Sequence, residues 1–314
     1  MRAPPETVLV TGGAGFIGSH VVDRLLAQGR EVVVVDDFSA GKRENLAAHA
    51  NERHLRVIVA DLRDDFAAAL HGVRPAAVVH LAAQVSVPRS LEDPVADLDI
   101  NLRASVRLLQ WAAAAGAGRL VLASSAAVYG EPARVPVSED MCDRPASPYG
   151  ASKRAAELFL ACLGPNLGVE TVALRPFNVY GPRQDPRSAY SGVVSQFLAR
   201  AAAGEPLRVL GDGSQTRDFV YVEDVARAFA AAIEAPGVDG LIANVGSGHS
   251  RTIAALAAEI VAVTRSTSPV ISGAARAGDV AHSLADCARA ADRLGWRAEV
   301  SLAEGLRRTL AWIG

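Results

Sequence analysis

The chain has few lysines, few cysteines and no excess of positive charge. It contains 32 Lys and Arg residues, but only Lys42 and Lys153 are lysines. A formal charge of -2 disfavours nucleic-acid and anionic-membrane partners, which require a concentrated positive field. The three cysteines are far apart and odd in number, which predicts reduced thiols in a cytoplasm and gives no metal-ligand spacing. Because no apolar run reaches the roughly 18 residues of a membrane span, we expect a cytoplasmic protein without a membrane segment.

The first half of the chain alternates short apolar runs with helical patterns. Continuous apolar stretches predict strands covered on both faces, over 7–11, 31–35, 55–60, 76–82, 119–125 and 169–175. Between them, apolar residues at helical spacing mark two inward-facing stripes, one on Ile17, Val21 and Leu25, the other on Leu102, Val106, Leu109 and Ala113. Strands that alternate with helices predict an α/β fold with a doubly wound parallel sheet.

A glycine-rich turn lies between the first expected strand and the first expected helix. Gly12 permits the tight turn, Gly15 lets backbone approach a pyrophosphate, and Gly18 lets the helix pack on the strand. The second strand ends in Asp36 and Asp37, where a carboxylate accepts hydrogen bonds from ribose hydroxyls. Their two charges would repel a 2'-phosphate, which favours NAD over NADP, although Lys42 and Arg43 follow a few residues later.

The motif predicts a dinucleotide-binding (Rossmann) domain over residues 1–175, with 218–236 packing on it. The pattern loosens after Pro176 into a Gly/Pro-rich stretch, and the remainder, 176–217 and 237–314, is expected to form a smaller, partly interleaved α/β substrate domain. Within it, Ser301 and Glu304 form a capping box that predicts a final helix.

Tyr149 and Lys153 are four residues apart, which on a helix places the phenol and the ammonium on one face. A cation beside the phenol favours the phenolate and makes Tyr149 a usable general base. Ser125 follows the fifth strand at the carboxyl edge of the sheet, where it can hold a substrate oxygen. His80 follows an apolar strand and is interpreted as a structural histidine.

These motifs together resemble the extended short-chain dehydrogenase/reductase family, and within it the UDP-galactose 4-epimerase type. The resemblance also includes His80-Leu-Ala-Ala83, Ser124-Ser125, Arg175-Pro-Phe-Asn178 and Arg217-Asp218, and it runs almost from end to end. It implies NAD as cofactor, a UDP-sugar as substrate and a homodimer, since the helices starting near Asp99 and Tyr149 resemble those that form the dimer interface in relatives.

The resemblance also implies the residues of each binding site. Those expected to hold NAD are Gly12, Gly15, Phe16, Ile17, Gly18, Asp36, Asp37, Phe38, Ser39, Ala40, Gly41, Asp61, Leu62, Leu81, Ala82, Ala83, Asn101, Ser124, Tyr149, Lys153 and Phe177. Those expected to hold the UDP-sugar are Ser125, Tyr149, Asn178, Val193, Arg217, Arg276, Asp279 and Ser283. From its position alone, Asp61 could equally be a turn or cap residue. Arg217 and Arg276 could equally form surface ion pairs.

The fate of the oxidised sugar is inferred from Ala126 and Ala127. Related dehydratases carry an Asp-Glu pair there and UDP-glucuronate decarboxylases a glutamate, whereas alanine supplies no acid or base. Return of the hydride to the opposite face then predicts a UDP-hexose 4-epimerase for UDP-glucose and UDP-galactose. Ser283, small where relatives carry a gating tyrosine, extends this to UDP-GlcNAc and UDP-GalNAc. The alternatives are a UDP-glucuronate 4-epimerase, a nucleotide-sugar 4-reductase and a non-catalytic dinucleotide-sensing regulator.

Overall fold

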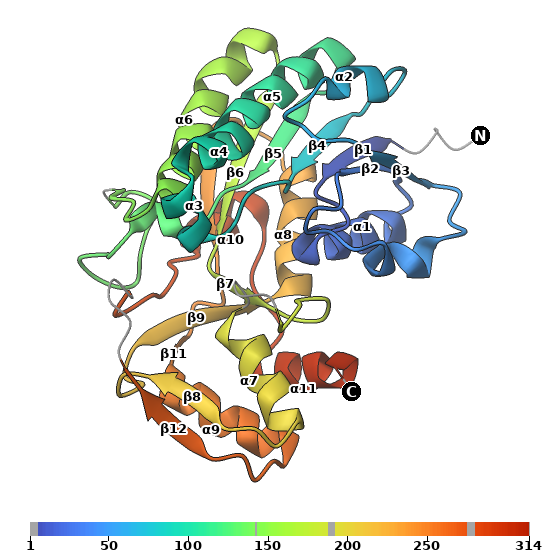
Figure 1. Ribbon diagram of the computed structural model, residues 1–314. Coiled ribbons are helices and arrows are strands. Elements are labelled where there is room, and N and C mark those ends of the chain that lie inside the picture. The colour runs from blue at the N-terminus through green and yellow to red at the C-terminus, as the bar shows by residue number, and fades with distance from the viewer. Residues whose placement is uncertain (1–5, 142, 188–191, 275–279, 314) are drawn as a thin grey trace.

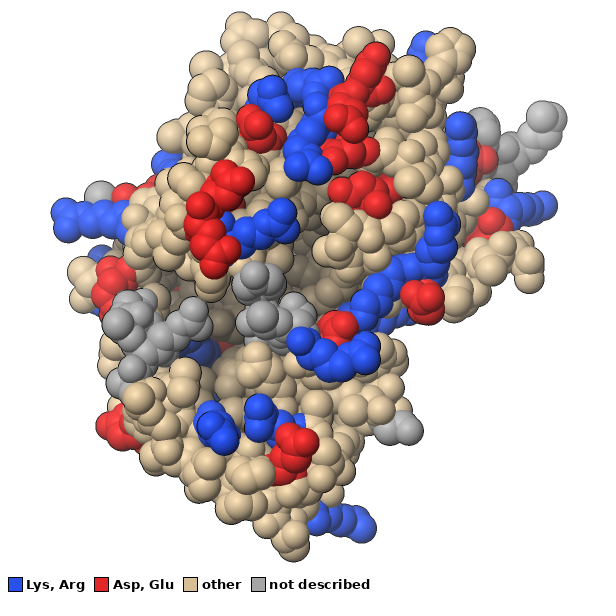
Figure 2. Space-filling model, viewed as in Figure 1, with Lys and Arg blue, Asp and Glu red and all other residues tan. Residues whose placement is uncertain are grey.

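The computed structural model describes residues 6–141, 143–187, 192–274 and 280–313 (Figure 1). The chain forms a larger region around a seven-stranded sheet and a smaller region below it in the view of Figure 1. Figure 2 shows the surface hollowed between these two regions, with both acidic and basic side chains along its borders.

All neighbouring strands of the large sheet are parallel, in the order β10-β6-β5-β4-β1-β2-β3. The six strands expected from the sequence all form, and the doubly wound parallel fold is confirmed. Three of them end earlier than expected, β3 at Val59, β4 at His80 and β5 at Ala123, and the residues that follow these strands enter the site described below. The strands are β1 (Thr7–Thr11), β2 (Glu31–Asp36), β3 (Leu55–Val59), β4 (Ala77–His80), β5 (Arg119–Ala123), β6 (Glu170–Pro176) and β10 (Leu241–Val245).

Helices cover both faces of this sheet (Figure 1). On one face, α1 (Phe16–Ala27) packs against α8 (Val222–Glu234), and Val21 and Phe229 are fully buried there with Val10 of β1. On the other face lie α2 (Phe66–Ala69), α5 (Ala104–Ala115) and α6 (Pro148–Leu167), which bury Leu108 and Leu160 against the sheet. The short helices α3 (Val87–Glu92) and α4 (Pro94–Leu98) lie beside α6.

The expected stripe on α5 is partly wrong. Leu109 is buried, but Leu102, Val106 and Ala113 are only half-buried, and Leu108 and Ala112 face the core instead. A π-helical turn, η2 (Asp99–Arg103), precedes α5 and adds a residue to the turn, which rotates the inward face of α5. The remaining short turns are the 3-10 helices η1 (Arg43–His49) and η3 (Ala126–Tyr129).

Among its described residues, the smaller region contains two small sheets and three helices. One sheet has the order β11-β9-β7 and the other pairs β12 with β8. Its core includes Phe197, Leu198 and Leu256. The final helix begins after Ser301, whose hydroxyl accepts from the Glu304 N–H at 3.3 Å. The elements are β7 (Asn178–Tyr180), β8 (Leu207–Leu210), β9 (Thr216–Tyr221), β11 (Ser250–Thr252), β12 (Val270–Gly273), α7 (Val193–Ala202), α9 (Ile253–Thr264) and α11 (Leu302–Ile313).

One part of the expected substrate domain lies in the larger region. We expected residues 237–314 to belong to the smaller domain, but β10 pairs in parallel with β6 and completes the large sheet. Helix α10 (Ala288–Leu294) packs against β10 and α8. After α8, a short turn brings the chain back beside β6. There Leu241, Ala243 and Val245 bury their side chains in the core of the larger region. The chain therefore passes between the two regions several times.

Among the described residues, no helix combines the length and apolar character needed to cross a bilayer. The cytoplasmic location expected from the cysteine pattern stays a prediction.

Candidate active site

The turn between β1 and α1 is closely packed around its glycines. Gly12 has a φ of +67°, and a Cβ there would lie 2.7 Å from the Ala82 backbone nitrogen. A Cβ on Gly18 would collide with the Gly12 carbonyl. Gly15 is the N-cap of α1 and provides no side-chain cap, so the first N–H groups of the helix face outward with the positive end of its dipole. This geometry suits the oxygens of a pyrophosphate.

Asp36 lies at the carboxyl end of β2 and is almost fully buried. Its two carboxylate oxygens accept from the Ala14 and Phe38 N–H groups, each at 2.9 Å. Burial raises the pKa of Asp36 above its usual value, against the opposing effect of these two hydrogen bonds. A Cβ on Gly41 would lie 2.6 Å from the same carboxylate. The residues 36–41 therefore wrap one carboxylate, as a ribose-binding turn requires.

The cations near this turn already have partners. Lys42 donates to Asp185 at 2.5 Å, and the Arg43 guanidinium lies over the Phe38 ring, 4.3 Å from its centroid. Asp37 caps its own turn by accepting from the Ser39 N–H at 2.9 Å. Lys42 and Arg43, the two cations that could have offset the charge of a 2'-phosphate, therefore already interact with other residues.

Asp61 follows β3 and is held by a residue that the sequence reasoning did not consider. Arg63 donates from Nε to the Asp61 carboxylate at 2.9 Å and from its backbone N–H at 2.8 Å. The Arg63 side chain is the main cause that lowers the pKa of Asp61. Leu62, between them, is buried.

Several expected cofactor residues meet at the carboxyl edge of the sheet. Because β1 lies between β2 and β4, the chain leaves β1 and β4 in opposite directions, and a crevice for a ligand forms there. The segment after β4 borders the glycine turn through Ala82, and Leu81 and Ala83 flank it. Ser124 and Phe177 follow β5 and β6, the next strands along the edge.

Tyr149, Ser125 and Lys153 come together from two elements. Ser125 follows β5, whereas Tyr149 and Lys153 lie on the inward face of α6 and are both buried. The Ser125 side chain lies close enough to the Tyr149 phenol to lower the pKa of that phenol. Lys153 Nζ donates to the Ala123 carbonyl at 3.0 Å.

The expected effect of Lys153 on Tyr149 differs from the structure. We expected the ammonium to favour the phenolate, but burial raises the pKa of Tyr149, the Ser125 side chain lowers it and the Asp97 charge raises it. Burial also lowers the pKa of Lys153 to about 8, although the charges of Asp97 and Glu157 oppose this change. Burial is the largest cause for both residues, because each charged form has lost its water.

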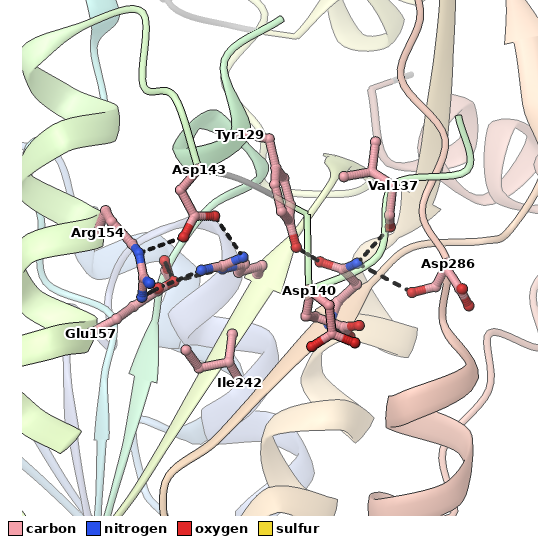
Figure 3. Close-up of polar contacts among 12 residues, drawn as sticks. Tyr129, Val137, Asp140, Asp143, Arg154, Glu157, Ile242 and Asp286 are labelled. Atoms are coloured by element: carbon pink, nitrogen blue, oxygen red, sulfur yellow. Dashed lines mark hydrogen bonds and ion pairs between the residues drawn. The ribbon is translucent and has the colours of Figure 1, made fainter. Parts of the chain in front are cut away.

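A buried ionic cluster that sequence reasoning missed joins α6 to the end of β6 (Figure 3). Glu157, one turn beyond Lys153 on α6, accepts from Arg175 Nε at 2.8 Å and from Arg154 at 3.0 Å, and it also accepts from the Ser124 hydroxyl. Asp143 accepts from Arg154 Nε at 2.6 Å. The sequence contained one signal for this cluster. Glu157 lies four residues after Lys153, so on a helix it shares the buried face of that lysine.

A second polar cluster lies on the other side of α6. The Asn101 side chain bonds the Gln84 backbone at both ends, with its oxygen accepting from the N–H and its amide donating to the carbonyl, each at 3.0 Å. Asp97 and Ser152 complete this cluster. His80 is buried between Thr11 at 2.7 Å and Ser105 at 2.8 Å, and burial lowers its pKa to about 3. It is therefore the neutral structural histidine expected.

Apart from Ser125 and Tyr149, the described residues expected to hold the substrate lie on the smaller region and its junction with the larger one. Asn178 begins β7 and donates to the Asp218 carbonyl at 3.3 Å, and Val193 begins α7. On β9, Arg217 donates to the Val280 carbonyl at 2.6 Å. The Ser283 N–H donates to the Thr216 carbonyl at 3.1 Å, which aligns its segment with β9. The expected residues Arg276 and Asp279 lie outside the described residues.

The residues present fit NAD. The uncapped start of α1 suits a pyrophosphate, and the buried Asp36 suits a ribose diol. The Lys153 ammonium carries three hydrogens, and the Ala123 carbonyl accepts one of them. With Tyr149 and Ser125 beside it, this crevice defines a dinucleotide-dependent oxidoreductase site of the short-chain dehydrogenase/reductase type. The chain belongs to the NAD dependent epimerase/dehydratase family, whose sequence pattern matches residues 8–246.

Similar proteins cover nearly the whole chain. A UDP-glucose 4-epimerase from Mycolicibacterium smegmatis is 42% identical over 304 residues, 96% of each chain. The structure of a UDP-glucose 4-epimerase from Thermus thermophilus in complex with NAD is 40% identical, with a TM-score of 0.89 over 98% of both chains. A UDP-N-acetylglucosamine 4-epimerase from Methanobrevibacter ruminantium is 38% identical, with a TM-score of 0.93 over 99% of this chain and 98% of the other.

Proposed function

We propose that this protein is an NAD-dependent UDP-hexose 4-epimerase, an isomerase that interconverts UDP-glucose and UDP-galactose and also UDP-GlcNAc and UDP-GalNAc. The observation that carries the proposal is the placement of Ser125, directly after β5, with the buried Tyr149 and Lys153 of α6 at the edge of a sheet that suits NAD. The full-length similarity to UDP-glucose and UDP-N-acetylglucosamine 4-epimerases supports the substrate class.

In this mechanism the start of α1, Asp36 and Lys153 would hold NAD, which would supply the hydride chemistry at C4 of the sugar. Tyr149 takes the proton from the 4-hydroxyl, and Ser125 donates a hydrogen bond to the same oxygen. Lys153 contributes a positive charge that stabilises the phenolate and donors for the nicotinamide ribose. After the keto sugar has rotated to present its opposite face, Tyr149 returns its proton to the oxygen. No proton is therefore gained or lost over the cycle.

The residues after Ser125 favour epimerisation over elimination or decarboxylation. The turn η3 consists of Ala126, Ala127, Val128 and Tyr129, and none of these four residues is an acid. Among them, Tyr129 points away into the buried cluster, where its hydroxyl donates to the Asn244 side chain at 2.7 Å (Figure 3). The 4-keto sugar therefore meets no additional acid or base on this turn.

The substrate is held from the side opposite the cofactor in this proposal. Asn178, Val193, Arg217 and Ser283 would contact the UDP-sugar, together with Arg276 and Asp279. Support comes from the pairing of β7 with β9, which places Asn178 and Arg217 on one small sheet. Binding through the nucleotide leaves the hexose free to rotate.

The decisive experiment measures conversion of UDP-galactose to UDP-glucose by the purified protein without added NAD. Release of NAD on denaturation, together with this conversion, is the expected result. A requirement for NAD(P)H with net reduction of the sugar would indicate the nucleotide-sugar 4-reductase instead. Conversion of UDP-glucuronate alone would indicate the UDP-glucuronate 4-epimerase, and released cofactor with no turnover would indicate a regulator.

We also propose that the protein forms a homodimer through α3, α4 and α6. These helices contact one another and expose large apolar side chains, with exposed fractions of 62% for Leu91, 69% for Val95 and 50% for Phe159. A second copy of the same face would cover them. Light scattering of the wild type should give the mass of a dimer, and Phe159→Glu should shift it toward a monomer.

A further inference from the structure

The buried carboxylate of Asp97 has no role in the reaction proposed above. It lies on the inward face of α4 with 1% of its surface exposed. One oxygen accepts from Gln84 Nε2 at 2.7 Å and from Asn101 Nδ2 at 3.2 Å, and the other accepts from the Ser152 hydroxyl at 2.5 Å. These three donors are neutral. A buried carboxylate stabilised by neutral donors keeps an uncompensated charge that acts on any nearby cation.

The nearby cation is Lys153, the neighbour of Ser152 on α6. Its ammonium is buried, and its acceptor among the described residues is the Ala123 carbonyl. Asp97 is the larger of two carboxylate influences that raise the pKa of Lys153 against the effect of burial. The smaller influence is Glu157, whose charge is already offset by Arg175 and Arg154 (Figure 3).

The other titratable groups around Lys153 do not supply the missing charge. From β4, His80 is neutral: the Ser105 hydroxyl donates to the Asn101 carbonyl at 2.6 Å, so His80 Nε2 must donate to Ser105. From α6, Tyr149 and Glu157 face the same space. Asp97, on α4, is therefore the carboxylate near Lys153 whose hydrogen-bond partners within the described part of the chain include no cation.

We propose that Asp97 is a positioning residue for the epimerase reaction: its charge, anchored through Ser152, holds Lys153 as an ammonium and sets the pH range in which Tyr149 and Lys153 work. The proposal rests on the proposed function. Because a negative charge disfavours loss of a proton from both neighbours, Asp97 raises the pKa of Tyr149 as well as that of Lys153. The active form combines a phenolate with an ammonium, so its optimum lies between the two titrations.

Asp97→Asn tests this proposal with almost no change of shape. The amide oxygen can still accept from Gln84 and Asn101, and the new amide can donate to the Ser152 oxygen while that hydroxyl donates to the Tyr149 carbonyl, 3.1 Å away. Both limbs of the pH profile of kcat should move to lower pH, the alkaline limb by about one unit. A merely structural role would lower the height of the profile and leave both limbs in place, which would overturn the proposal.

A second readout is independent of turnover. The absorbance change of the Tyr149 phenolate, obtained by subtracting the titration of Tyr149→Phe from that of the holoenzyme, should shift to lower pH in Asp97→Asn. If the wild type shows no epimerisation but this shift occurs, the proposed function fails and the coupling of Asp97 to Tyr149 and Lys153 stands. An unshifted phenolate titration in an active enzyme overturns the coupling alone.

Asp93→Asn is the matched control. Asp93 is the N-cap of the same helix and accepts from the Ala96 N–H at 3.0 Å, a role that asparagine fills equally well. This variant removes an exposed carboxylate from α4 and should leave the profile unmoved. If Asp97→Asn fails to fold, Ser152→Ala provides the second test. Loss of the donor leaves the Asp97 charge less screened, so both limbs should move to higher pH, and unmoved limbs would contradict the proposal.

Discussion

Arg175 and Glu157 form a two-point ion pair in the interior of the protein, with Nε to Oε1 at 2.8 Å and the second nitrogen to Oε2 at 2.7 Å. Arg175 lies near the end of β6 and Glu157 belongs to α6, so the pair joins the catalytic helix to the sheet. The Arg175 guanidinium also lies over the Tyr129 ring, 4.7 Å from its centroid. Through Ser124, which donates to Glu157, the same pair also reaches the turn that carries Ser125.

Glu157→Gln should destabilise the fold by about 3 kcal/mol, because it removes the two-point counter-charge of the buried Arg175 and leaves only the Asp143 carboxylate, 3.2 Å away. Urea denaturation followed by circular dichroism measures the change. Glu234→Gln, which breaks an exposed pair with Arg30, is the control and should unfold close to the wild-type midpoint. Equal midpoints for the two variants would show that the buried pair contributes no more than a surface pair.

Tyr149→Phe should lower kcat by about 10²- to 10⁴-fold, the usual contribution of a general acid–base group, while NAD stays bound. Lys153→Met should reduce both turnover and cofactor content, and Ser125→Ala should lower kcat less than either. Turnover assays combined with the NAD released per chain separate the three variants. Near-normal turnover in Tyr149→Phe would refute the mechanism.

The apo protein should bind NAD far more tightly than NADP, because the buried Asp36 would meet the 2'-phosphate with like charge. Asp36→Asn should reduce this preference. Asp37→Asn should not, because Asp37 is exposed and bonds Ser39 of its own turn. Calorimetric titration with both cofactors gives the ratio of affinities, and comparable affinities in the wild type would contradict the prediction.

Ser283→Tyr should abolish conversion of UDP-GlcNAc and leave conversion of UDP-glucose, because a bulky ring excludes only the larger C2 substituent. Parallel assays of kcat/KM with the two substrates measure the difference. Ser283→Thr provides a control of intermediate size and should keep both activities. Equal losses on both substrates, or a wild type inactive on UDP-GlcNAc, would show that another residue limits the pocket.

Stability should fall as the pH decreases below about 6.5, in part because His80 stays neutral in the folded protein, where burial lowers its pKa to about 3. In this range His80 binds a proton in the unfolded chain but not in the folded one. His80 alone therefore lowers the free energy of unfolding by about 1.4 kcal/mol for each pH unit of acidification. Urea denaturation at pH 7.5 and pH 5 should show a smaller difference for His80→Gln than for the wild type. An identical difference would mean that His80 takes up a proton in the fold.

The sequence by itself determined six strands of the large sheet and the local motifs of this protein. Alternating apolar runs specify buried parallel strands, and the glycine turn, Asp36 and the i+4 spacing of Tyr149 and Lys153 act over short distances along the chain. These features depend on backbone geometry and neighbouring residues, so they can be placed from the sequence without knowledge of the packing.

The tertiary structure decided everything that depends on which distant segments meet. Residues far apart in sequence meet near Lys153: Asp97 comes from α4, and Arg175 of β6 pairs with Glu157, the neighbour of Lys153 on α6. The strand β10 joins the large sheet for the same reason, because β6 offered an edge beside the end of α8. The direction of the pKa change at Tyr149 was likewise beyond the sequence, since burial, the largest cause, is a property of the packed fold.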